Sequence, residues 1–218
     1  MRALSEWFTT PRLLAGALVL NTEVALVLLY VFVTNATVTE PLVYVYPWVW
    51  VNASALAVWA ASPTPVSDRH RYAAVGVGVA YFAVMAYFGG LVGTGGERAL
   101  GASLHWLPPG YGPALTYAGE LVRVVVEPYK LVGYATLAYL VYVTATDTSA
   151  SMLSGVVGLF SCVSCTWPLL ATVFTGLFGS ASAAATVASS RALGVSTLVF
   201  CLSVALLVWR PTPSFARA

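Results

Sequence analysis

Two cysteines, Cys162 and Cys165, lie three positions apart in the apolar run 153–179. On a helix, residues i and i+3 share a face, so both thiols can bind one ligand or form a disulfide with each other. Pro168 has no backbone N–H and leaves the carbonyl of Ser164, four residues earlier, without its helical partner. Inside a bilayer, neighbouring helices, hydroxyl groups or water have to compensate for such a defect. This stretch is therefore the first candidate site.

Three interpretations of Cys162 and Cys165 stay open. The thiols form a reversible disulfide and exchange electrons with a quinone or a partner thiol. Alternatively, they are soft ligands for copper(I) or another thiophilic metal. In the third interpretation they are small packing residues that let a neighbouring helix approach closely. Cys201 is either a third ligand or a core residue, and the chain has no second C-x-x-C for a four-cysteine zinc site.

Glu23 is the second candidate, because it falls near the middle of the apolar segment 13–34. A carboxylate at the centre of a bilayer costs about 2.5–3.5 kcal/mol and is rarely there without a role. One interpretation is a proton-accepting or cation-binding site. The other is a packing group, hydrogen-bonded within the bundle or paired with Arg123 or Lys130.

Two amides accompany Glu23. Asn52 lies near the middle of segment 42–61, at about the depth of Glu23, and Asn21 lies two residues before Glu23. Together these residues would line a polar pocket, or they would form hydrogen bonds between helices.

A polar stripe precedes the fourth apolar segment. Glu120, Arg123, Glu127 and Lys130 recur at three- and four-residue intervals, which predicts an amphipathic helix over residues 114–127. In it Arg123 and Glu127 would form an i,i+4 ion pair. The helix would lie on the outer membrane surface, or it would extend the fourth span into a water-filled cavity.

The composition predicts an integral membrane protein. Of 218 residues, 59% are hydrophobic and only 8% are charged, where soluble domains carry about 25% charged residues. With about 20 residues per span, the chain forms one integral membrane domain, residues 1–218, without room for a separate soluble catalytic domain. The expected partners are the lipid bilayer and other membrane subunits. A net charge of +2 argues against a nucleic-acid partner.

We expect an all-α polytopic bundle of six transmembrane helices. The spans are 13–34, 42–61, 72–92, 128–146, 152–178 and 192–209. The first is too long for a signal peptide and is expected to be retained. Segment 152–178 is either one helix kinked at Pro168 or a re-entrant pair, and we favour the kinked helix.

Positive charge predicts the orientation in the cell membrane. Six arginines fall on one side of a six-span bundle, and they are Arg2, Arg12, Arg69, Arg71, Arg210 and Arg217. Because Lys and Arg favour cytoplasmic loops, both termini are expected in the cytoplasm. The connection 93–113 would then lie outside.

Known catalytic motifs are missing from the sequence. It contains no Walker-type glycine loop, no G-x-S-x-G and no H-E-x-x-H. We therefore assign no catalytic residue, and an enzyme is the less favoured class.

Two blocks carry a resemblance to a known group of proteins. Gly158-Leu-Phe-Ser-Cys-Val-Ser-Cys-Thr-Trp-Pro-Leu-Leu-Ala and the Asn-Thr-Glu at 21–23 resemble an uncharacterised family of small archaeal polytopic membrane proteins. That resemblance covers most of the chain and implies no activity beyond an association with respiratory oxidases. The thiol-plus-proline segment also resembles membrane thiol–disulfide transporters and mercury permeases. Their cysteines are placed differently, so no residue role is carried over.

Three functions follow as hypotheses. The first is the handling of a soft metal or reducing equivalents at Cys162 and Cys165, as an accessory factor of a membrane respiratory complex. The second is a non-catalytic membrane subunit or scaffold. The third is a proton-coupled transporter of small solutes, which requires Glu23 to face a cavity.

Overall fold

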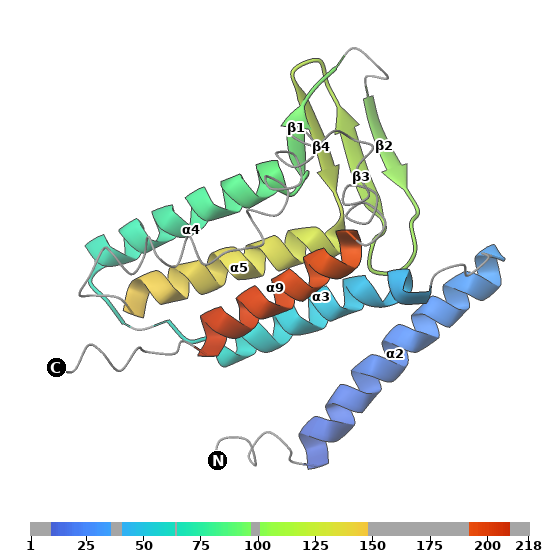
Figure 1. Cartoon of the computed structure of the whole chain (residues 1–218), viewed down its shortest axis with the longest axis horizontal. Helices are drawn as coiled ribbons and strands as arrows, with labels where there is room; N and C mark the ends of the chain where they lie inside the picture. Colours follow the sequence, from blue (N-terminus) through green and yellow to red (C-terminus); the bar gives the residue numbers. More distant parts are fainter. Residues whose placement is uncertain (1–9, 36–40, 64, 97–100, 148–191, 210–218) are drawn as a thin grey trace, which may run out of the picture.

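A computed structural model describes residues 10–35, 41–63, 65–96, 101–147 and 192–209 (Figure 1). The helices in these ranges are α2 (Thr10–Thr34), α3 (Pro41–Ala60), α4 (Asp68–Phe88), α5 (Pro128–Asp147) and α9 (Ala192–Trp209). The strands are β1 (Val92–Thr94), β2 (Gly101–His105), β3 (Ala114–Ala118) and β4 (Val122–Val126).

The predicted all-α bundle of six spans is wrong. Five of the six predicted segments are helical, but a four-stranded antiparallel sheet lies between α4 and α5. The remaining segment, 152–178, falls outside the described residues. Residues 114–127, predicted as an amphipathic helix, form β3 and β4, and the outer connection 93–113 contains β2. Four of the five residues in β4 are valines, whose branched side chains favour extended backbone over helix.

The sheet has an apolar face and a polar face. Its strand order is β1-β4-β3-β2, and the register pairs Leu104 with Leu115 and Tyr117 with Val124. Paired residues point to the same side of a sheet, so these four residues share one face. The opposite face carries Ser103, His105, Thr116 and Arg123.

The helices α3, α4, α5 and α9 pack around one core. α5 contacts α3, α4 and α9, and α9 also contacts α3. Leu137 and Leu140 of α5 and Phe200 of α9 are fully buried there. α2 lies at an angle to this group and stands away from it along much of its length (Figure 1). Among the described residues, Leu13–Thr34, Pro41–Ala60 and Asp68–Phe88 are long and apolar enough to cross a membrane.

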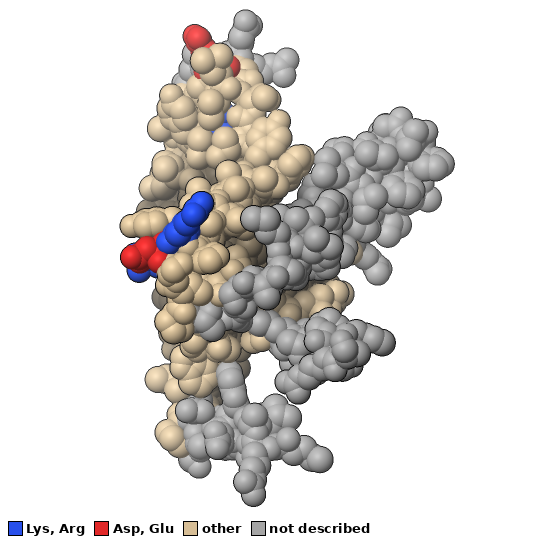
Figure 2. All heavy atoms as spheres, turned by 90° about the vertical axis from the view of Figure 1, so that its left-hand side faces the viewer, with Lys and Arg blue, Asp and Glu red and all other residues tan. Residues whose placement is uncertain are grey.

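Charge gathers at the end of the bundle opposite the sheet. Asp68, Arg69 and Arg71 occupy the first turn of α4, and Arg71 approaches Asp68 to 3.5 Å. Figure 2 looks at this end and shows blue and red side chains together on a surface with little other charge. The sheet begins after the other end of α4, about 30 Å away along a helix of 21 residues.

Candidate functional site

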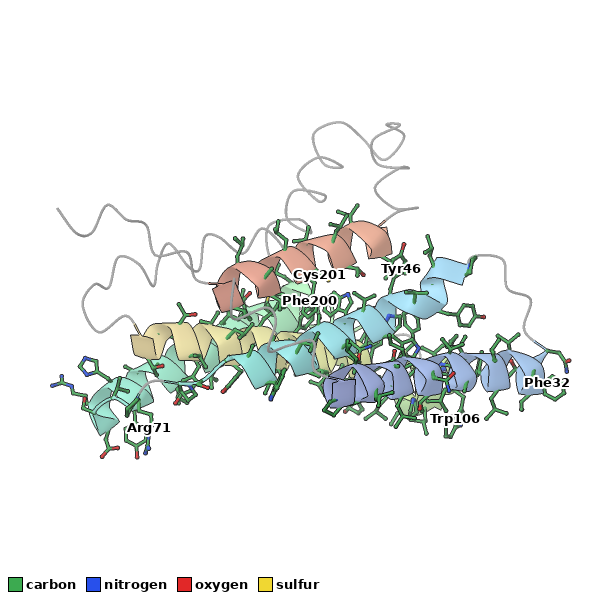
Figure 3. The ribbon with its side chains drawn as sticks, turned by 90° about the horizontal axis from the view of Figure 1, so that it is seen from below. Phe32, Tyr46, Arg71, Trp106, Phe200 and Cys201 are labelled. Atoms are coloured by element: carbon green, nitrogen blue, oxygen red, sulfur yellow. The ribbon has the colours of Figure 1, made fainter. Side chains whose placement is uncertain are left out.

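The contact between α2 and α3 is polar. Glu23 is only 8% exposed, and the side-chain amide of Asn52 donates to both of its carboxylate oxygens, at 2.8 Å and 3.0 Å. Among the described side chains of α2, only Glu23 is buried, and three residues on the same face, Val27, Tyr30 and Val31, are half-buried. Phe32, near the end of α2, points away from the other helices (Figure 3). Glu23 and Asn52 therefore join α2 to the bundle.

This arrangement satisfies the hydrogen bonding of the buried carboxylate. The two residues lie near the midpoints of their helices, at one depth, as the sequence predicts. Both carboxylate oxygens accept hydrogen bonds, so burial of Glu23 leaves neither of them without a donor. Asn21 is exposed and takes no part in the contact. Glu23 pairs with Asn52, and neither Arg123 nor Lys130 forms a salt bridge with it within the described residues.

A second site is an aromatic cluster that we call the Trp50 cluster, made of Trp50, Tyr111, Tyr129, Tyr134 and Phe200. The Trp50 ring stacks on Phe200 with centroids 4.0 Å apart and planes 5° apart. It meets Tyr129 and Tyr134 edge-on, at 5.5 Å and 5.8 Å. In Figure 3, Phe200 lies between α9 and α3. Aromatic pairs in these geometries stabilise beyond the area that they bury, so this cluster holds α3, α5 and α9 together.

The indole of Trp50 is also fixed by a hydrogen bond. Its Nε1–H donates to the hydroxyl of Thr197 on α9, at 3.0 Å. Gly133 on α5 makes room for the ring, because a Cβ at that position would clash with the Trp50 ring. The sequence feature that indicates this site is the aromatic-rich start of α3, from Tyr44 to Trp50.

Residues 2–214 match a family of unknown function, DUF7546. The chain belongs to that family. The predicted membership of an uncharacterised family is thereby confirmed, and the family's description assigns no activity. No curated protein and no solved structure matches the chain.

Arg123 and Glu127 are separate in this DUF7546 chain. Arg123 is exposed on the polar face of β4, and Glu127 lies between β4 and α5, where its carboxylate approaches Lys130 Nζ at 2.6 Å. The predicted Arg123–Glu127 pair is wrong because it required a helix. An extended chain separates residues four apart by about 13 Å.

Of the three cysteines, Cys201 lies in the described part of the chain. Cys162 and Cys165 lie outside the described residues. Cys201 is a free, half-buried thiol on α9 that packs against the core. Within the described ranges, no three His, Cys, Asp or Glu side chains are close enough to hold a metal ion.

Proposed function

We propose that the chain is an integral membrane protein that acts as a non-catalytic subunit of a membrane assembly. The observation that carries this proposal is the exposed apolar surface of α2. α2 is a 25-residue apolar helix whose large side chains are mostly exposed, with a carboxylate as its buried residue. A surface of this kind is poorly suited to water, whereas lipid or the helix of another subunit would cover it.

Helix length supports the membrane location. α2, α3 and α4 have 25, 20 and 21 residues. At 1.5 Å per residue they are about 30–38 Å long, which is enough to cross a hydrocarbon layer of about 30 Å.

The charge at the start of α4 supports an orientation. Arg69 and Arg71 would lie in the cytoplasm, together with Arg12 in the first turn of α2. Because the sheet follows the opposite end of α4, it would stand outside the cytoplasm. Both chain termini would be cytoplasmic.

The buried polar groups support a structural role. Asn52 binds Glu23 between α2 and α3, and Trp50 binds Thr197 between α3 and α9. Each pair holds two helices together. Transport through Glu23 is the weaker proposal, because both of its oxygens accept from Asn52.

A second candidate function rests on the spacing of Cys162 and Cys165 in an apolar run. These thiols would bind copper(I) or carry reducing equivalents for a membrane respiratory complex. Sequence spacing alone supports this proposal.

Two measurements test these functions. The first is extraction of membranes with alkaline carbonate, after which an integral protein stays in the pellet; release into the supernatant would rule out the membrane location. The second is copper(I) binding by purified protein, measured by competition with bicinchoninate. The subunit proposal expects no binding that depends on Cys162 and Cys165. Binding that survives in Cys201→Ser and is lost in Cys162→Ser/Cys165→Ser would favour the second function instead.

A further inference from the structure

The loop between β2 and β3, residues 106–113, reaches back to the start of α3. Pro47 lies inside α3 and has no N–H, so it leaves the carbonyl of Val43, four residues earlier, without its helical partner. The hydroxyl of Tyr111 donates to that carbonyl oxygen at 2.9 Å. A residue of the sheet loop thus supplies the hydrogen bond that the helix lacks.

The loop is shaped to fit against Pro47. Gly110 has a φ of +94°, and a Cβ there would lie 2.5 Å from the Pro47 Cβ. Only glycine adopts this backbone easily and leaves the space free. The amides of Tyr111 and Gly112 both donate to the carbonyl of Pro108, at 3.0 Å and 3.1 Å. These bonds fix the turn that presents the Tyr111 hydroxyl.

Ring contacts continue from this loop into the helical core. Tyr111 is 8% exposed and meets Tyr129 edge-on at 5.0 Å. Tyr129 in turn meets Trp50 at 5.5 Å. The sheet is therefore connected to α3 twice, through the Val43 carbonyl and through the Trp50 cluster.

We propose that residues 106–113 form a latch that couples the sheet to α3. With the latch closed, Tyr111 completes the hydrogen bonding of α3 at Pro47 and the start of the helix is held. When the loop moves away from α3, the Val43 carbonyl loses its hydrogen-bond donor and the first turns of α3 become less stable. Displacement of the sheet by a binding partner is thereby transmitted to a helix of the bundle. That this helix lies in a bilayer rests on the proposed function, whereas the coupling itself does not.

The test is hydrogen–deuterium exchange, read by mass spectrometry on the purified full chain in detergent micelles. Tyr111→Phe removes the hydroxyl and keeps the ring. We expect the amides in the first half of α3 to exchange about fivefold faster, as the loss of one hydrogen bond implies. Exchange in α4 should stay unchanged. Tyr117→Phe, a half-exposed tyrosine on β3, is the matched control and should change neither helix.

A second pair of variants distinguishes displacement of the loop from backbone strain as such. Gly110→Ala should speed exchange in α3, because the new methyl group pushes the loop off Pro47. Gly90→Ala introduces a similar strain at a φ of +79° but meets no neighbouring atom, so α3 should keep its exchange rate.

Pro47→Ala gives the sharpest comparison, because it restores the backbone N–H that would donate to the Val43 carbonyl. In that background Tyr111→Phe should no longer speed exchange in α3. An equal effect of Tyr111→Phe with and without Pro47 would overturn the latch. So would unchanged exchange in the Tyr111→Phe protein, or an increase spread evenly over α3, α4, α5 and α9. Because the measurement is made in micelles, these outcomes are independent of the carbonate extraction that tests the membrane location.

Discussion

Asn52 donates from its side-chain amide to both carboxylate oxygens of Glu23, and this pair joins α2 to α3. The remaining described surface of α2 is largely exposed and apolar. The attachment of α2 therefore depends on a polar contact at mid-helix, while most of its other described side chains are exposed.

Asn52→Ala should weaken this attachment. It leaves the buried Glu23 carboxylate without its donor, so we expect the free energy of unfolding to fall by about 1–3 kcal/mol. Reversible unfolding in mixed micelles measures the change. Asn21→Ala is the control, because Asn21 is exposed and should give no loss. The double variant Glu23→Leu/Asn52→Leu should recover much of the loss, and a double variant less stable than Asn52→Ala would show that the pair does more than join helices.

The space around Trp50 gives a second prediction. In Gly133→Ala the new methyl group clashes with the Trp50 ring, so stability should fall by about 2 kcal/mol. Gly76→Ala in α4 is the matched helical substitution, with no atom near its new methyl group. Its stability should be unchanged or should rise by up to about 1 kcal/mol, as helix propensity predicts. Thermal unfolding followed by tryptophan fluorescence measures both, and equal effects would contradict the tight fit at Gly133.

Alkaline pH should open the contact between Tyr111 and Val43. Burial and, next, the nearby Glu127 carboxylate raise the pKa of Tyr111 from 10.0 to about 12, with a smaller contribution from Tyr46. A raised pKa means that folding favours the protonated hydroxyl. The stabilisation is therefore complete below pH 10 and is lost as the pH rises from 10 to about 12. Unfolding measured against pH should show this loss in the native protein and a shallower one in Tyr111→Phe, and parallel curves would argue against it.

The hydrophobic segments predicted the helices well, because a helix pairs the backbone N–H and C=O groups of a long apolar segment within the segment itself. The common depth of Glu23 and Asn52 followed from their positions in two such runs. The sheet was missed because its strands are short and because Glu120, Arg123, Glu127 and Lys130 happen to repeat at helical spacing. The valines of β4 carried the opposite preference and were the better guide.

The contact of Tyr111 with α3 joins residues 68 positions apart, and no local pattern encodes it. Pro47 is the sequence feature that indicates such a contact. A proline inside an apolar helix predicts a carbonyl in need of a donor, although it does not say which residue supplies the donor.

The proposed orientation places the sheet outside the cell and the start of α4 in the cytoplasm. Single cysteines at Ser103→Cys and Ser67→Cys test it directly in intact cells, in a background with Cys162, Cys165 and Cys201 replaced by serine. A membrane-impermeant maleimide should label position 103, on the exposed strand β2, without permeabilisation. It should label position 67, just before the first turn of α4, only after permeabilisation. Labelling in the reverse order, or of neither position until the cells are opened, would contradict this orientation.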